Sequence, residues 1–380
     1  MMHSVGIATG RLHIRLQPSD WTLERLCGFA ARNNPKRGFL FLSKVLGKHW
    51  PVRAGEMRQT HEALAERVPA AADDEVVFIG MAETATGLGH GVFDAWQERH
   101  GRGLYLQTTR YTLDGAAAFR FEEAHSHASE IRLYAPDSAA LRERLQRATL
   151  AVLVDDEIST GRTLAALVAS LQPSCPVLRR VQLLSLTDFS AGKACAAVGA
   201  LPGIESCASA SLLSGDFSFE PDPAFSAPPA ESAVGAAPCR RGHVAGYSAR
   251  LGLERTPALP AALADRLAQA SGRRCLVVGT GEFMHGAFLL AHELEKRGVE
   301  AYVQSTTRSP ILAGTDISQI ERVPDPYGEG IPNFLYNFRR GDYDRVWVVH
   351  ETPRDETVAR LCSILGADSV LLRPGEEAGP

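Results

Sequence analysis

Short apolar runs alternate with segments of helical period along this chain, and one stretch without either pattern separates them into two groups. The stretch at 205–240 is rich in Ser, Ala, Pro and Gly, which is typical of a linker or irregular segment. Strand-like runs occupy 76–80, 103–109, 151–156 and 180–187 before it, and 275–279, 301–307, 345–350 and 369–373 after it. The pattern predicts two α/β units with largely parallel sheets, at 1–204 and 241–380.

The two groups of runs repeat one another in sequence. Residues 77–93 and 277–288 both pass from an apolar strand through Gly and Glu to His-Gly-x-Phe, which opens a helical segment. The next strands, YLQTTR at 105–110 and YVQSTTR at 302–308, are also alike, and a third strand follows each at a similar distance. We interpret the chain as a duplicated α/β unit. Glycine-rich turns that arose independently are the alternative, because such turns are common.

The residues with the clearest chemistry follow the third strand of the first unit, VLVDDEISTGRT at 152–163. A buried strand ends in the carboxylates of Asp155 and Asp156, at the edge where open α/β sheets bind ligands. The turn at 159–163 brings hydroxyls and backbone N–H groups to the start of a helix, where the helix dipole favours an anion. The pattern predicts a site for a sugar phosphate. A capped helix beside two solvated acids is the alternative.

This stretch resembles the PRPP-binding motif of type I phosphoribosyltransferases, in which apolar residues precede D-D-x-x-x-T-G-x-T. The resemblance implies a fold with a type I phosphoribosyltransferase-like parallel sheet domain, followed by a second, divergent α/β domain. It implies that Asp155 and Asp156 hold the ribose hydroxyls of PRPP, and that Mg²⁺ is bound through PRPP and water without an assigned protein ligand. The residues implied to cradle the 5-phosphate are Ser159, Thr160, Gly161, Arg162 and Thr163.

The loop after the first strand of the first unit lies where the family binds the pyrophosphate of PRPP. Its residues are Met81, Ala82, Glu83, Thr84, Ala85 and Thr86. The flanking glycines let backbone amides approach an anion, although the carboxylate of Glu83 is out of place there. Arg110 ends the second strand, and its guanidinium suits the same anion, which adds it to the catalytic pair Asp155 and Asp156. A plain tight turn and a surface arginine are the alternatives.

Two further segments are candidates for covering the site. The family carries a flexible catalytic loop where this chain has 111–130, and Arg120, His125 and His127 are the lid residues expected to meet the leaving group or the nucleobase. A metal site at the His-x-His pair is the weaker interpretation, because no third ligand is evident in the sequence. The basic and aromatic segment 33–53 forms either a hood over the nucleobase or an ordinary packing element.

A second signature lies in the repeat, at Thr306, Thr307, Arg308 and Ser309. It is similar to that of the TRSP domain, which follows phosphoribosyltransferases of bacterial tellurium-resistance gene clusters. The resemblance implies biosynthesis of a nucleoside-like metabolite from PRPP and a nucleobase-like acceptor, and likeness to orotate phosphoribosyltransferases favours a pyrimidine-like acceptor.

The second unit has no phosphate turn after its third strand, which ends at His350. Many relatives of the family are homodimers in which one subunit lends a loop to the other. The second unit therefore either replaces that partner, as an intrachain pseudo-dimer in which Arg308 reaches the first site, or binds an anion of its own.

Composition narrows the class of protein further. The chain has 380 residues, 45% hydrophobic and 22% charged, which suits a globular protein with a sizeable core. A net charge of −4 argues against nucleic acid or an acidic membrane as partner. Seven cysteines without C-x-x-C spacing, together with the absence of a signal pattern or a membrane-length apolar run, favour the cytoplasm. The alternative functions are a PRPP- or nucleotide-binding sensor and, less strongly, a hydrolase with water as acceptor.

Overall fold

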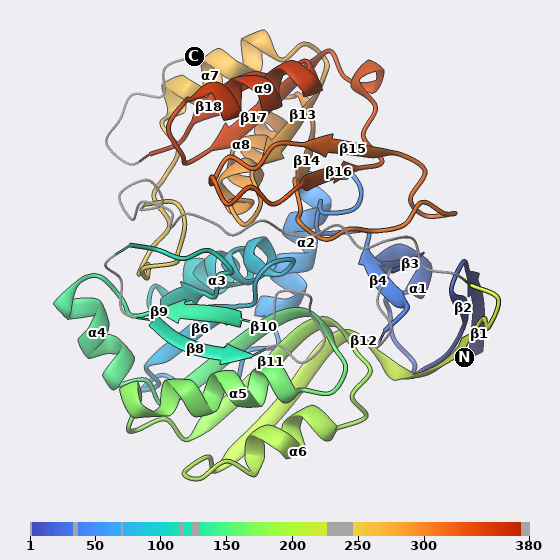
Figure 1. The fold of residues 1–380 in the computed structure, drawn as a ribbon. Helices are drawn as coiled ribbons and strands as arrows, with labels where there is room; N and C mark the ends of the chain where they lie inside the picture. The colour runs from blue at the N-terminus through green and yellow to red at the C-terminus, as the bar shows by residue number, and fades with distance from the viewer. Residues whose placement is uncertain are drawn as a thin grey trace.

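The computed structural model describes residues 2–32, 37–69, 71–114, 118–122, 130–225 and 246–373. Its fold is mixed α/β with parallel-dominated sheets, as the alternation of apolar runs predicts. The two units lie one above the other in Figure 1, with α2, α3 and α8 between the two sheets. All eight predicted strands are present, and their ends differ from the prediction by one or two residues at most.

The first sheet has seven strands in the order β1-β2-β12-β11-β10-β6-β7. In that order they are Met2–Ile7, Gly10–Leu16, Ser206–Pro221, Arg180–Asp188, Leu150–Ile158, Val76–Gly80 and Leu104–Gln107. The five strands from β12 to β7 are parallel, and β1 and β2 add an antiparallel hairpin. The chain leaves β6 for β7 on one side and later returns to β10 on the other. The carboxyl ends of β6 and β10 therefore form the switch point where such sheets bind ligands.

Helices cover both faces of this sheet, with α3 on one face and α5 and α6 on the other (Figure 1). The helices of the first unit are α1 (Leu23–Leu26), α2 (Ala54–Ala65), α3 (Thr86–His100), α4 (Ala139–Gln146), α5 (Arg162–Leu171) and α6 (Lys193–Gly199), with a 3-10 turn at Gln172–Ser174. In α5 the buried residues Leu164, Leu167, Val168 and Leu171 recur at helical spacing, so this face packs on the sheet. Two hairpins lie outside the sheet: β3 (Cys27–Ala31) with β4 (Phe39–Ser43), and β8 (Ala118–Glu122) with β9 (Glu130–Tyr134).

The second sheet has the order β18-β17-β13-β14-β5. Its strands are Asp368–Leu371, Arg345–His350, Arg274–Gly279, Glu300–Ser305 and Val52–Arg53. The other elements of this unit are α7 (Ala261–Ala270), α8 (His285–Lys296), α9 (Glu356–Leu365), a 3-10 turn at Arg340–Asp342, and the hairpin of β15 (Ile320–Val323) with β16 (Asn333–Tyr336). Within the described ranges, no helix combines the length and the apolar character needed to span a membrane.

The structure corrects the predicted linker at 205–240. Its first part forms β12, a strand of 16 residues that pairs parallel with β11 and then antiparallel with β2. The sequence of β12 contains no β-branched residue, and only Phe217 and Phe219 in its second half favour a strand. The strand conformation of its first half therefore follows from pairing with β11 and not from local propensity. The first unit thus extends past residue 204. Residues 226–245 lie outside the described residues.

Each unit extends a short arm to the sheet edge of the other, and we call β5 and residues 249–253 the exchanged arms. β5 pairs with β14 at the edge of the second sheet, and its Val52 belongs to the second core. In return, Tyr105 N–H on β7 donates to the carbonyl of Leu253 at 2.8 Å, and Gln107 N–H donates to that of Ala249 at 3.1 Å. The predicted domain boundaries therefore do not account for the two exchanged arms, each of which pairs with the sheet of the other unit.

The loops that follow β6 and β13 have matching hydrogen bonds. Ala82 N–H donates to Thr108 Oγ1 at 2.7 Å, and Gly281 N–H donates to Thr306 Oγ1 at 2.8 Å. The same two threonines donate their own N–H groups to the carbonyl of the glycine that ends each strand, at 2.9 and 3.0 Å. These equivalent contacts support the proposal that the two units arose by duplication.

Candidate functional site

Asp155 and Asp156 lie near the carboxyl end of β10, at the switch point of the first sheet. β10 runs to Ile158, two residues further than predicted, because its pairing with β11 continues to that residue. The apolar residues of β10 that precede the acids are fully buried, whereas both acids are half-buried. Asp156 N–H donates to Asp155 Oδ1 at 3.0 Å. The strand thus positions two carboxylates at the edge where a ligand would bind.

The charge of Asp156 depends on its surroundings. Burial raises the pKa of its carboxyl to about 6, the neighbouring charge of Glu157 adds to this shift, and Arg37 opposes it. Arg37 is held by Glu157, because its Nη2 donates to the two carboxylate oxygens at 2.6 and 2.8 Å. Asp156 therefore takes up a proton at a higher pH than an ordinary aspartate does.

Part of the segment predicted as either a hood or a packing element lies beside Asp156, and part packs into the second unit. In its first part, Leu42 and Ser43 of the β3–β4 hairpin line a small cavity together with Asp156, which agrees with a hood. In its second part, Lys48 is buried in the second unit, where its Nζ donates to the carbonyl of Gly281 at 2.6 Å. Lys36 lies outside the described residues.

The turn at Ser159 and Thr160 leads into α5, and Gly161 is the N-cap residue of that helix. Gly161 has φ +71°, in the left-handed region that favours glycine, and a Cβ there would lie 2.4 Å from Ala194 Cα of α6. Glycine also has no side chain to bond the N–H groups of the first turn, where Arg162 and Thr163 lie. The start of α5 therefore leaves these N–H groups available to an anion.

The equivalent helix of the second unit, α9, is closed by its own side chain. Its N-cap residue is Asp355, whose Oδ1 accepts the N–H groups of Thr357 and Val358 at 3.0 Å each. Of these two helices, α5 alone presents an uncapped first turn beside paired acids. This contrast agrees with the interpretation that the phosphate turn was lost from the second unit.

The predicted pyrophosphate loop, from Met81 to Thr86, connects β6 to α3 at the same switch point. Met81 N–H donates to the carbonyl of Val154 at 2.9 Å, which ties the loop to the strand that carries the acids. Met81, Ala85 and Thr86 are buried, and Ala82, Glu83 and Thr84 are half-buried. The loops after β6 and β10 thus flank one space.

Glu83 points away from that space and into the second unit. Its two carboxylate oxygens accept the N–H of Arg308 at 3.2 and 3.4 Å, and Lys48 Nζ lies 3.5 Å away. Burial opposes ionisation of Glu83, but the charges of Lys48 and Arg308 outweigh it and lower the pKa of this carboxyl. Glu83, which would be out of place beside a pyrophosphate, therefore pairs with Arg308 and Lys48 instead.

The second unit makes the reciprocal contact. Glu282, the equivalent of Glu83, accepts the backbone N–H of Arg110 at 2.8 Å and the hydroxyl of Thr109. Arg110 is half-buried three residues after β7, because this strand ends at Gln107, earlier than predicted, and its own carbonyl accepts a hydrogen bond from Arg132 Nη1 at 3.1 Å. The two glutamates thus join the units at their loops.

The TTRSP segment, residues 306–310, contacts the predicted pyrophosphate loop of the first unit through its backbone. Thr306 and Thr307 are buried at the end of β14, and Ser309 N–H donates to Thr307 Oγ1 at 3.2 Å. The guanidinium of Arg308 pairs with Glu329 and lies over the ring of Tyr111, 4.6 Å from its centroid. The TTRSP segment therefore contacts the predicted pyrophosphate loop, but the side chain of Arg308 is engaged by Glu329 and Tyr111.

The predicted lid is only partly described. Arg120 lies in β8, opposite Arg132 of β9, in a stretch that we expected to be irregular. His125 and His127 lie outside the described residues.

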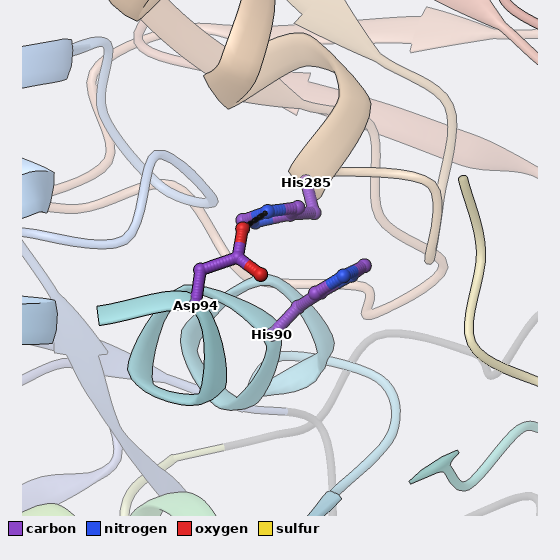
Figure 2. Close-up of side chains that lie close together, drawn as sticks. All are labelled: His90, Asp94 and His285. Carbon is purple, nitrogen blue, oxygen red and sulfur yellow. Dashed lines mark hydrogen bonds and ion pairs between the residues drawn. The ribbon is translucent and has the colours of Figure 1, made fainter. Parts of the chain in front are cut away.

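Sequence reasoning missed a histidine cluster where the two units meet (Figure 2). His90 and Asp94 of α3 and His285 of α8 bring candidate metal-ligand atoms within 4.8 Å of one another. The two imidazole rings are stacked, with centroids 3.8 Å apart and an interplanar angle of 18°. A metal ion lies in the plane of each imidazole that binds it, so parallel rings do not share one. The cluster is instead joined by hydrogen bonds, from His285 Nε2 to Asp94 at 2.7 Å and through Thr256 to His90.

A buried arginine was also missed. Arg250, a residue of the second exchanged arm, is fully buried, with its Nε 3.2 Å from Glu282 and its Nη1 bound to Glu351. Glu351 directly follows β17, at the position where the first unit has its paired acids, and Tyr327 donates to it at 2.7 Å. In the second unit, the sheet edge that corresponds to the predicted ligand site is therefore occupied by the side chains of Arg250, Tyr327 and Glu351.

Comparisons with known proteins agree with the division of the chain into two units. A family model described as phosphoribosyl transferase matches residues 26–215, and one described as the TRSP domain C-terminal to that family matches 247–365. A search of curated proteins gave no match.

Three solved structures illustrate the similarity. The adenine phosphoribosyl transferase from Trypanosoma brucei has 13% identity and a TM-score of 0.35, covering 48% of this chain and 72% of that chain. The enzyme from Giardia lamblia, solved with 9-deazaadenine, has 16% identity and a TM-score of 0.31, covering 52% and 91%. The orotate phosphoribosyltransferase from Aeropyrum pernix has 14% identity and a TM-score of 0.26, covering 46% and 78%. Because the first family model spans half of the 380 residues, the chain belongs to the phosphoribosyl transferase family and carries a TRSP domain after it.

Proposed function

We propose that the first unit transfers 5-phosphoribose from PRPP to a nitrogen of a nucleobase-like acceptor and releases pyrophosphate. The observation that carries this proposal is the uncapped start of α5, with Gly161 in a left-handed conformation, beside Asp155 and Asp156. A bond forms between the acceptor nitrogen and C1 of the ribose, and the bond from C1 to pyrophosphate breaks. A pyrimidine-like base is the acceptor class that we propose first.

Each part of the site has a role in this reaction. The first-turn N–H groups of α5, with Ser159, Thr160 and Thr163, hold the 5-phosphate. Asp155 and Asp156 accept the ribose hydroxyls, and the loop 81–86 with Arg110 holds the pyrophosphate as its charge develops. Holding both ends of PRPP fixes C1 in front of the acceptor, and this positioning supplies much of the rate enhancement.

Magnesium fits the same site. Bound through PRPP and water, the ion would lie beside Asp155 and Asp156, whose carboxylates offer oxygen atoms alone, the kind of donor that suits Mg²⁺ and its waters. When it is bound with PRPP, the ion would neutralise charge on the departing pyrophosphate. Asp155 and Asp156 would orient the ribose beside it, and Glu157 is held back by Arg37.

The proposal is tested by measuring pyrophosphate released from PRPP and Mg²⁺ with a panel of pyrimidine-like and purine bases. Release that depends on one class of base supports transfer and names the acceptor. Binding of PRPP without release, across the whole panel, would instead favour the sensor. Release that needs no base would favour the hydrolase.

The raised pKa of Asp156 predicts a pH dependence. Below about pH 6 this carboxyl is protonated and loses the charge with which it accepts ribose hydroxyls. The affinity for PRPP should therefore rise as pH increases through about 6 and level off above 7. Isothermal titration with PRPP at constant Mg²⁺, from pH 5 to 8, measures this.

Two variants separate this effect from titration of PRPP itself. Glu157→Gln removes the like charge and frees Arg37, so the midpoint should move to lower pH. Asp156→Asn should bind more weakly and lose the component with a midpoint near 6. A wild-type profile identical in shape to that of Asp156→Asn would contradict the assignment.

We further propose that the second unit is a built-in partner for the first. Support comes from the reciprocal glutamate contacts, from the exchanged arms, and from the closed start of α9. Because the second unit already packs on the loops of the first within one chain, we expect a monomer. Sedimentation velocity at micromolar concentration should give the mass of one chain, whereas a stable dimer would count against the built-in partner.

A further inference from the structure

Two cysteine side chains meet where α6 packs on β12. Cys195 lies in α6 and Cys207 in β12, and their sulfur atoms are 3.2 Å apart, with the thiol of Cys207 donating to Cys195. Both residues are half-buried, so a small oxidant can reach them. A disulfide has an S–S distance of about 2.05 Å, so the two sulfurs need to approach by only about 1 Å to form one.

The other described cysteines are in a different environment. Cys27, Cys175, Cys275 and Cys362 are buried, and burial raises the pKa of each thiol, to about 12 for Cys175 and Cys275 and about 11 for Cys362. The hydrogen bond from Cys207 lowers the pKa of Cys195 instead. Because the thiolate is the reactive form, Cys195 is the thiol that oxidises first.

The pair is mechanically connected to the phosphate turn. Ala194, the neighbour of Cys195, packs so closely on Gly161 that a Cβ on Gly161 would lie 2.4 Å from Ala194 Cα. Cys207 belongs to the sheet itself, where it is paired with Val181 of β11. A bond between the two sulfurs would therefore tie α6, on which the turn rests, to the sheet.

We propose that Cys195 and Cys207 are a peroxide-sensitive pair whose disulfide fixes α6 under the phosphate turn. The Cys195 thiolate attacks one oxygen of the peroxide, the O–O bond breaks, and the hydroxide that leaves becomes water on taking up a proton. The resulting sulfenic acid is attacked by the Cys207 sulfur, which forms the S–S bond and releases a second water. Two thiols are thus oxidised by two electrons while hydrogen peroxide is reduced to two waters.

The test uses the full chain in a Cys239→Ser background, because Cys239 lies outside the described residues. After treatment with hydrogen peroxide and digestion without reductant, mass spectrometry should find the Cys195 and Cys207 peptides linked, with two hydrogen masses lost. Two thiols should disappear, and dithiothreitol should restore them. In the oxidised form, hydrogen exchange at the amides of 159–163 should slow by at least about twofold.

Single variants, Cys195→Ser and Cys207→Ser, serve as matched controls and should show neither the linked peptide nor slower exchange. Retention of all thiols at a peroxide dose that oxidises free cysteine, or pairing of Cys195 with another residue, would overturn the disulfide. Equal exchange in the oxidised and reduced forms would overturn the connection to the phosphate turn. None of these readouts uses PRPP, so they stand apart from the test of the proposed function.

Discussion

Replacement of Asp155 and Asp156 together by asparagine is expected to lower pyrophosphate release by at least about 10²-fold while the protein stays folded. The loss follows because amides present only half the acceptor oxygens of carboxylates to the ribose hydroxyls and carry no charge. The fold should tolerate the change because asparagine has the same shape, both positions are half-buried, and Asp156 already takes up a proton at a higher pH than an ordinary aspartate does. Release is measured with a coupled pyrophosphate assay.

A matched control is Asp216→Asn, at an exposed position of β12 that pairs with Arg15 far from the switch point. It should keep normal activity. Circular dichroism and the thermal midpoint of the double variant should match those of the wild type. A double variant that is folded and turns over at a near-normal rate would remove these acids from the proposed mechanism.

The largest change in stability is expected from Arg250→Met. Methionine keeps most of the volume of arginine but leaves the buried carboxylates of Glu282 and Glu351 without their shared cation. Removing one partner from a buried ion pair costs about 3–5 kcal/mol of unfolding free energy. Urea unfolding followed by tryptophan fluorescence measures the difference.

Two comparisons locate the cause of that loss. Arg15→Met, at the exposed pair with Asp216, should change the unfolding free energy by only about 0–1 kcal/mol. Adding Glu351→Gln to Arg250→Met should recover part of the loss, because one of the stranded charges is then gone. If Arg250→Met behaves like Arg15→Met, the buried cluster contributes no more to stability than an exposed ion pair does.

The parts of the fold that local pattern dictates could be predicted from the sequence. The run before Asp155 is apolar because β10 is central and covered on both faces, and a strand of that kind is hard to mistake. The turn after it was recognisable because few residues other than glycine adopt the positive φ of Gly161, and hydroxyl side chains flank it. The position of the acids at the switch point then followed from sheet topology.

The parts that depend on distant segments could not be predicted in the same way. The first half of β12 has little strand propensity and becomes a strand by pairing with β11. Lys48 belongs to a segment for which two interpretations stayed open, and it is buried because carbonyls and Glu83, far away in sequence, satisfy its ammonium group. The histidine cluster was equally hidden, since His90 and His285 become neighbours only when the units pack together.

The cap on α9 shows what covalent fusion permits. In a symmetric pair of identical subunits, an aspartate at this helix start would occur twice and would close both anion receptors at once. With the two halves encoded in series, Asp355 occupies one helix start while Gly161 keeps the other open. If the second unit is a built-in partner as proposed, one half can lose its anion site and still support the other, whose helix start stays open.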